Sequence, residues 1–318
     1  MFVKCSFCSN KAITKLRYAK LNLCSKHFVE YVEKRFSRII SKNKLFKNMD
    51  KVVVAVSGGK DSVTLLHLLH KVSKEFNFEI VGLTIDLGIR KYSVESIEKA
   101  LKNYEMLNIK YKIIELKNEY GFSVDDIVKY KRKAGIKKPI CSICGTIKRY
   151  IMNKYALEIG ANAVATGHNL DDMVYYIFSS LYSGKVDNLA KISIYSPSEF
   201  KFVAKVKPLA YISEKETLLY AILRKLPFNY DVCPYARLRT FHEYIRKTSN
   251  ILEENIPGLK ITFAKMFLEK INPILYSHYL SEKKFKECEI CGMPTTGKIC
   301  SFCKIKSTMG KVLKNDQG

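Results

Sequence analysis

The chain has 318 residues, of which 47% are hydrophobic, and a formal net charge of +25 at pH 7. This length permits one large domain with small flanking modules. The excess of Lys and Arg favours a polyanionic partner, with nucleic acid preferred to an anionic membrane. The sequence contains neither an apolar run of about 18 residues nor a signal-peptide pattern. We therefore expect a cytoplasmic protein that does not interact with membranes.

The first predicted element is a metal module at the N-terminus. Cys5 and Cys8 form a Cys-x-x-Cys pair, and after fifteen residues Cys24 and His27 form a second pair of the same spacing. Each pair can bind one edge of a Zn²⁺ tetrahedron, so the four side chains complete a structural site. We assign residues 1–30 to a zinc finger.

A strand, a Gly-rich loop and a helix are predicted next. The β-branched run 51–56 is typical of a buried parallel strand, and apolar residues recur at helical spacing after Ser62. Backbone N–H groups of such a loop bind phosphate, helped by the helix dipole. This is not a Walker A loop, because Val54 replaces its first Gly and Asp61 follows Lys60. The candidate nucleotide ligands here are Ala55, Ser57, Gly58, Gly59, Lys60, Asp61 and Ser62. His67 and His70, in the helix, are expected to be ordinary surface residues.

Strands and helices then alternate along the chain. Further strands are predicted within 78–89, 109–116, 161–172 and 201–209. This alternation indicates an α/β fold with a parallel five-stranded sheet and helices on both faces. Ligands of such sheets bind beyond the carboxyl ends of the strands. The candidate ATP and Mg²⁺ ligands at this edge are Ile85, Gly167, Asp171 and Asp172, with His168 beside them.

The remaining cysteines fall into two groups. Cys288, Cys291, Cys300 and Cys303 form two Cys-x-x-Cys pairs eight residues apart, which predicts a four-cysteine zinc ribbon. Cys141, Cys144 and Cys233 lie between the two metal modules, and three ligands cannot close a tetrahedral protein site. By itself, the pair Cys141 and Cys144 is compatible with half of a zinc site, a redox dithiol or the anchor of an iron–sulfur cluster.

Several motifs resemble one enzyme family. The loop SGGKDS resembles the pyrophosphate loop of PP-loop ATPases, which cleave ATP between the α and β phosphates. AVSGGKDS, PICSICGTIKRY, ATGHNLDD and DVCPYA, bracketed by two zinc modules, resemble the TtuA/NcsA class of tRNA 2-thiolation enzymes over nearly the whole chain. The resemblance implies an adenine nucleotide alpha hydrolase-like fold. It also implies adenylation of the C2 oxygen of a tRNA uridine, followed by displacement of AMP by sulfur.

The resemblance also implies roles for individual residues. Cys141, Cys144 and Cys233 match the ligands of a [4Fe–4S] cluster, which would leave one iron free to hold the sulfur. Lys148 matches the family's catalytic lysine, and Asp172, or else Asp171, matches its catalytic or ATP-contacting aspartate. With this resemblance the chain divides into the finger at 1–30, a basic linker helix at 31–48, a catalytic domain at 49–280, and a zinc ribbon with a tail at 281–318.

Two basic segments, 31–47 and 236–250, are assigned to tRNA phosphate contacts rather than base readout. The cations expected to project from them are Lys34, Arg35, Arg38, Lys42, Arg237, Arg239, Arg246 and Lys247. The stretch CGTIKRY favours uridine 54 of the T-loop over uridine 34 of the anticodon. The sulfur donor is expected to be a thiocarboxylated ubiquitin-like protein or free sulfide, and a homodimer is compatible with the resemblance.

Three other interpretations remain open. The cysteines could form a persulfide and a resolving disulfide without a cluster, helped by a low-pKa thiolate beside Lys148. A PP-loop enzyme that uses an amine, such as a lysidine synthetase, would not need the three cysteines. A zinc-containing RNA-binding protein without enzymatic activity would not need the intact SGGKDS loop.

Overall fold

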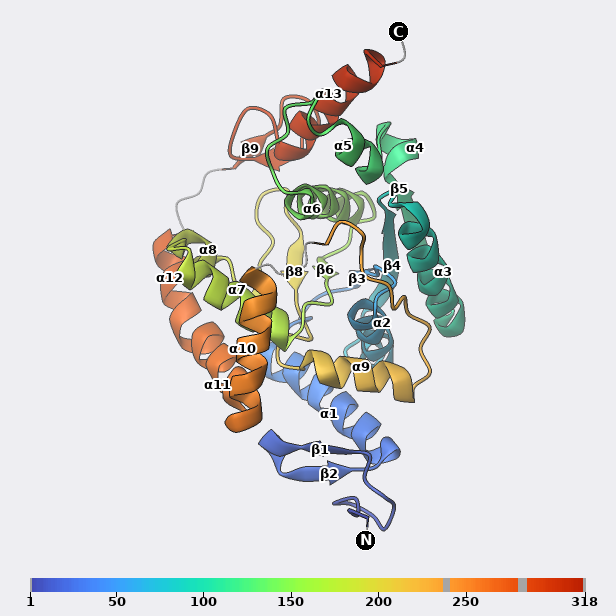
Figure 1. Ribbon diagram of the computed structural model, residues 1–318, viewed down its shortest axis with the longest axis vertical. Helices are drawn as coiled ribbons and strands as arrows, with labels where there is room; N and C mark the ends of the chain where they lie inside the picture. The colour runs from blue at the N-terminus through green and yellow to red at the C-terminus, as the bar shows by residue number, and fades with distance from the viewer. Residues whose placement is uncertain (1, 237–240, 280–284, 317–318) are drawn as a thin grey trace.

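The computed structural model describes residues 2–236, 241–279 and 285–316. Figure 1 shows a central sheet with helices around it, the N-terminal hairpin at one end of the longest axis and the C-terminal helix at the other. Arg237 and Arg239 lie outside the described residues. Within the described part of the chain, none of the helices combines the length and the apolar content that crossing a bilayer requires.

The central sheet has the strand order β5-β4-β3-β6-β8-β7. Five strands are parallel, as predicted, and β7 pairs with β8 in the antiparallel direction. The prediction of five strands missed β7, because a two-residue strand is too short to show a period. The strands are β3 (Lys51–Ala55), β4 (Glu79–Asp86), β5 (Tyr111–Glu115), β6 (Ala163–Ala165), β7 (Tyr195–Ser196) and β8 (Ala204–Val206).

Strand β3 shows how the sequence divides the core between the two faces of the sheet. Val52 and Val54 pack in one hydrophobic cluster, whereas Val53 packs in a second one. All three are fully buried, because successive strand residues point to opposite faces and helices cover both. The expected α/β fold with two covered faces is therefore confirmed.

Different helices cover the two faces. The cluster of Val52 includes residues of α1 (Ser25–Asn43), α2 (Lys60–Ser73), α3 (Arg90–Leu107), α7 (Leu170–Tyr182), α8 (Val186–Ala190), α9 (Glu214–Leu223), α11 (Leu259–Met266) and the π-helix η2 (Phe267–Ile271). The cluster of Val53 includes residues of α4 (Leu116–Tyr120), α5 (Val124–Tyr130), α6 (Ile140–Glu158) and α13 (Ser301–Lys314). The remaining elements are β1 (Thr14–Leu16), the 3-10 helix η1 (Arg17–Ala19), β2 (Leu21–Leu23), α10 (Phe241–Asn255), α12 (Asn272–Tyr279), β9 (Lys286–Glu287) and β10 (Pro294–Thr295).

The C-terminal module shares the second core with α6. Phe302 stacks on Tyr150 of α6, with ring centroids 3.8 Å apart and an interplanar angle of 7°. Phe302 is only 2% exposed, and Cys288, Cys300 and Cys303 are buried in the same cluster. The ribbon therefore packs on the helix that carries Cys141 and Cys144.

Two sequence predictions about helix faces were wrong. His67 is not a surface residue, because it is buried and its Nε2 lies 2.8 Å from Asn103 Oδ1 of α3. Arg35 does not project from α1, because its guanidinium pairs with Glu216 of α9 at 2.7 Å. Which face of a helix is exposed depends on the neighbouring elements, which the local sequence does not specify.

Candidate active site

The loop between β3 and α2 is closed by its own hydrogen bonds. Ser62 Oγ donates to the carbonyl of Gly59 over 2.9 Å and accepts from the backbone N–H of Ser57 over 3.1 Å. Gly58 has a φ of +77°, and a Cβ on it would lie 2.1 Å from the carbonyl oxygen of Ser96 in α3. Only glycine combines this conformation with so close an approach. The backbone is thus held against α3 at the N-terminus of α2, where phosphates bind.

Lys60 and Asp61 of the loop are tied to α9. Lys60 Nζ lies 2.8 Å from Asp61 Oδ2 and 2.7 Å from Glu214 Oε1. Asp61 Oδ1 accepts a hydrogen bond from Thr217 Oγ1 over 2.5 Å. An ammonium has three N–H donors, so Lys60 retains one for a phosphate oxygen.

A cavity of about 100 Å³ lies beside the loop, between β3, β4, α3 and α6. Four of the residues predicted as ligands or catalysts line it: Ala55, Ser57, Ile85 and Lys148. The sequence interpretation missed other lining residues, such as Tyr92 and Met152, because they belong to helices that reach the sheet edge only in the folded chain. Apolar walls with few polar groups suit the base of a nucleotide.

The loop after β6 meets the SGGKDS loop. A Cβ on Gly167 would lie 3.1 Å from the carbonyl carbon of Asp61 and from the nitrogen of Ser62, so the two loops are in close contact. Asn169 caps α7, and Asp172 accepts from the Asn169 N–H over 3.1 Å, which completes a capping box. Burial, with smaller contributions from the charges of Asp61 and Asp171, raises the pKa of Asp172 to about 6, against the opposing effects of the Asn169 hydrogen bond and the charge of Arg246.

Asp171 has structural partners. Its side chain is buried and pairs with Lys260 of α11, and it accepts from the Glu214 N–H over 2.7 Å. These contacts join α7 to α9 and α11 and engage both carboxylate oxygens. A contact between Asp171 and ATP remains a prediction.

His168 lies at the same edge with its Nδ1 2.8 Å from Thr166 Oγ1. Burial, together with the positive charges of Lys207, Lys148 and Arg149, lowers the pKa of His168 to about 4. The imidazole is therefore neutral at pH 7. The sequence analysis had singled out only Lys148 of these three cations, so it did not predict a positively charged environment for His168.

The three cysteines outside the metal modules lie near one another. Cys141 is exposed in the first turn of α6, and its Sγ lies 3.9 Å from the carbonyl oxygen of Tyr235, two residues after Cys233. Burial raises the pKa of Cys144 to about 11, with Lys148 opposing this rise and Cys141 and Cys233 adding to it. The loop carrying Cys233 thus returns to the start of α6. Ligands of a cluster bind different irons, so their sulfurs need not converge as they do around a single ion.

The cysteines and the cavity are adjacent. Lys148 lines the cavity and lies one helical turn after Cys144, on the same side of α6. Tyr92 of α3 also lines the cavity, and its pKa is raised first by burial and then by its proximity to Cys233. A nucleotide in the cavity would therefore lie beside the cysteine group.

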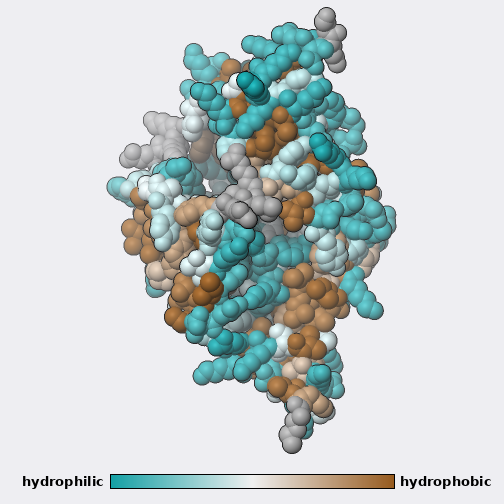
Figure 2. All heavy atoms as spheres, in the orientation of Figure 1, coloured by the Kyte–Doolittle hydropathy of each residue, from teal (hydrophilic) through white to brown (hydrophobic). Residues whose placement is uncertain are grey.

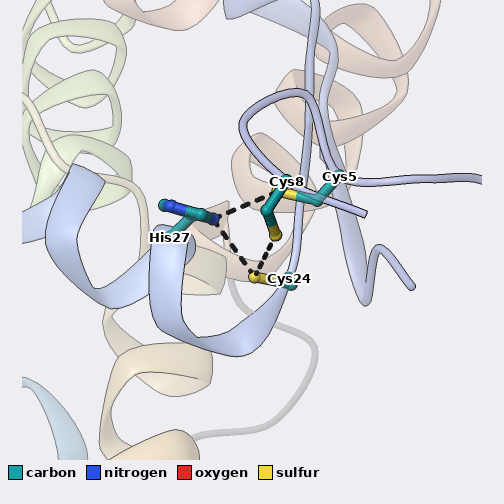
Figure 3. Close-up of side chains that lie close together, drawn as sticks. All are labelled: Cys5, Cys8, Cys24 and His27. Carbon is teal, nitrogen blue, oxygen red and sulfur yellow. Dashed lines mark hydrogen bonds between the residues drawn. The ribbon is translucent and has the colours of Figure 1, made fainter. Parts of the chain in front are cut away.

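The N-terminal quartet is formed as predicted. Figure 3 shows the four side chains converging, with Cys5 and Cys8 from the turn that precedes β1 and Cys24 and His27 from the start of α1. Their ligand atoms all lie within 4.8 Å of one another, and His27 Nδ1 is 3.4 Å from the sulfurs of Cys5 and Cys24. Helix α1 begins at Ser25, earlier than the predicted 31, because Cys24 is its N-cap. The donor set, three sulfurs and one nitrogen, could hold a metal ion and fits tetrahedral Zn²⁺.

The C-terminal quartet has a similar arrangement. Cys288, Cys291, Cys300 and Cys303 also have their ligand atoms within 4.8 Å of one another. Cys300 is the N-cap of α13, and its N–H donates to the Cys288 sulfur over 3.3 Å. Four sulfurs at this spacing could hold a metal ion and also fit Zn²⁺.

The cations predicted to bind tRNA differ in whether they form ion pairs within the protein. Lys34 and Arg38 are exposed on α1, whereas Lys42 pairs with Glu269 at 3.2 Å. Arg246 pairs with Glu214, and Lys247 pairs with Glu243 at 2.9 Å. Hydrophilic side chains cover much of the face seen in Figure 2, with apolar patches between them.

Comparisons with known proteins agree with this geometry. Residues 29–248 match the PP-loop domain family, and residues 4–29 match the N-terminal LIM domain of the 2-thiouridine synthetase TtuA. The chain is 39% identical over 302 residues to the tRNA-5-methyluridine(54) 2-sulfurtransferase of Pyrococcus horikoshii, covering 95% of this chain and 93% of that protein. It is 36% identical over 301 residues to the protein of the same name from Thermus thermophilus, covering 95% and 90%.

A solved structure is also similar. The U34-tRNA thiolase NcsA from Methanococcus maripaludis, with its [4Fe-4S] cluster, superposes with a TM-score of 0.78 at 30% identity, covering 98% of this chain and 97% of that one. The two family models together match residues 4–248, and the identities and the superposition extend over nearly the whole chain. The chain therefore belongs to the TtuA/NcsA family of PP-loop proteins.

Proposed function

We propose that this protein is an ATP-dependent tRNA 2-sulfurtransferase. ATP adenylates the C2 oxygen of a tRNA uridine with release of diphosphate, and a sulfur nucleophile then displaces AMP to leave 2-thiouridine. The observation that carries this proposal is the adjacency of the nucleotide cavity and the cysteine group, with Lys148 reaching both.

The residues around the cavity have complementary roles in this reaction. The SGGKDS backbone and Lys60 hold the phosphates, while Ala55 and Ile85 flank the base. Lys148 stabilises negative charge on the transferring phosphate or on the activated oxygen. Asp172, held near Asp61 by its capping box, acts in orienting ATP and Mg²⁺.

Cys141, Cys144 and Cys233 would hold a [4Fe–4S] cluster, and their three thiols at one edge of the cavity fit this group. When bound, the cluster supplies an iron without a protein ligand to carry the sulfur. The chain's own contribution is to hold that sulfur against the activated carbon, so that proximity raises the rate. Two Zn²⁺ ions at the terminal quartets would stabilise the flanking modules.

We assign the reaction to uridine 54 in the T-loop. The relatives of highest identity described above carry position 54 in their names. The second candidate is uridine 34, favoured by the structural similarity to a U34-tRNA thiolase. The sulfur donor, a thiocarboxylated ubiquitin-like protein or free sulfide, and a homodimeric assembly are part of the proposal, as is a cytoplasmic location where tRNA is modified.

The test is anaerobic reconstitution of the full chain with iron, sulfide and zinc, followed by incubation with ATP and unmodified tRNA. Mass spectrometry of nuclease fragments should find 2-thiouridine at position 54, with one AMP and one diphosphate formed per modified uridine. Thiolation at position 34 alone would favour the second candidate. Absence of thiolation at both positions by the cluster-loaded protein would refute the proposed function.

A further inference from the structure

Four basic side chains gather at the carboxyl ends of β6 and β8. They are Lys148 and Arg149 of α6, Lys205 within β8 and Lys207 after it. Among residues 2–236, 241–279 and 285–316, none of the four forms an ion pair with an Asp or Glu. Most other cations discussed above have such a partner, whereas the one aromatic contact in this group is that of Lys205 Nζ, 5.1 Å from the Phe202 ring centroid, so no described carboxylate balances its positive charge.

The backbone places these residues at one edge. Ala165 at the end of β6 pairs with Val206 at the end of β8, and the Thr166 N–H donates to the Val206 carbonyl over 3.0 Å. Lys207 comes directly after Val206, and its Nζ donates to the Ser193 carbonyl over 2.5 Å. That single bond uses one of three ammonium donors, which leaves two for a ligand.

Arg149 completes the group from α6. A Cβ on Gly145 would lie 3.1 Å from Arg149 Nη1, so the guanidinium lies back over the helix beside Cys144. The positive charges of this group help to lower the pKa values of Lys205 and Lys207. Burial, together with the charge of Lys205, lowers the pKa of Lys207 to about 8. Burial and the charge of Arg149 likewise lower the pKa of Lys205.

We infer that Arg149, Lys205 and Lys207 form a binding site for a phosphate group of one of the two substrates. The phosphate is either a backbone phosphate of the tRNA or the diphosphate released from ATP. A phosphate would balance the unpaired charge, and a guanidinium can bind it through two parallel hydrogen bonds. This inference rests on the proposed function, since it places the phosphate beside the uridine that reacts at the cavity.

The test compares binding of each substrate by the cluster- and zinc-loaded full chain. Lys207→Gln and Lys205→Gln each remove one charge, and Lys207→Arg keeps it. Lys112→Gln is the control, because it removes an exposed charge from β5 at the opposite edge of the sheet. Affinity for tRNA is measured across a range of KCl concentrations, and affinity for ATP is measured without tRNA.

If the ligand is a tRNA phosphate, the slope of log K against log salt should become shallower by roughly 0.7–1 for each Gln variant. The ATP affinity should then be unchanged, and Lys207→Arg should restore the slope. If the ligand is the diphosphate, ATP affinity should fall about tenfold and the salt slope should not change. Gln variants that match Lys112→Gln in both assays would overturn the inference. Failure of the wild type to bind tRNA would instead count against the proposed function, and the ATP measurements would still decide the inference.

Discussion

Gly58→Ala should weaken both folding and nucleotide binding. At a φ of +77° an L-residue is strained by about 1–2 kcal/mol. The new Cβ would also lie 2.1 Å from the Ser96 carbonyl oxygen, a backbone atom that cannot rotate away as a side chain can. Overpacking of this kind typically costs about 1–3 kcal/mol. We therefore expect the free energy of unfolding to fall by about 2–5 kcal/mol, and the loop to shift away from α3.

Gly59→Ala is the matched control. Gly59 has a φ of −82°, and the nearest atom to an added Cβ is Ser57 Oγ at 3.7 Å. This change should alter the unfolding free energy by less than about 1 kcal/mol, because lost backbone freedom in the unfolded chain offsets a poorer N-cap. Urea unfolding of the zinc-loaded protein measures the unfolding free energy of both variants. Titration with ATP measures how far each variant weakens nucleotide binding by the loop. Equal unfolding midpoints for the two variants would refute the argument about the contact with Ser96.

The other predictions concern the second core, the buried aspartate and the metal modules. Phe302→Ala should lower the free energy of unfolding by about 3–5 kcal/mol, because it leaves a cavity against α6, whereas exposed Phe200→Ala should change it by no more than about 0.5 kcal/mol. Asp172→Asn tests the raised pKa of Asp172. Because the folded state binds the proton more tightly than the unfolded state does, the protonated carboxyl contributes its full stabilisation below about pH 4, and this stabilisation is lost as the pH rises through about 6. The unfolding free energy of wild type minus variant should therefore fall by about 3 kcal/mol over that range, and a flat difference would contradict the burial argument. Cys8→Ser should reduce the zinc content from two ions to one per chain, measured by atomic emission on the purified protein; no change would show that the N-terminal quartet does not bind zinc.

The metal modules and the phosphate loop could be predicted because their chemistry is local. Cys5 and Cys8 are separated by one tight turn, so their spacing alone fixes their geometry. Gly58 and Gly59 follow a recognisable strand and precede a helix, so the tight loop at the N-terminus of α2 could also be inferred from the sequence. Strands β3 to β6 were predicted from alternating hydrophobic segments, whereas their order in the sheet was not.

Features that depend on packing between distant segments could not be predicted. The exposure of Arg35 depends on Glu216, about half of the chain away, and the burial of His67 depends on Asn103. Lys207 looked like one lysine among many, because only the register of β6 and β8 brings it beside His168. Tyr92 likewise reaches the cavity only through the position of α3.

The central claim is that the nucleotide cavity and the cysteine group act in one reaction, and Cys233→Ser tests it most directly. Cys233 belongs to the cysteine group and is not among the residues that line the cavity. The variant should retain tRNA-dependent diphosphate release but form no 2-thiouridine, as measured by mass spectrometry of the same reaction mixture. Formation of 2-thiouridine at the wild-type rate would contradict the account.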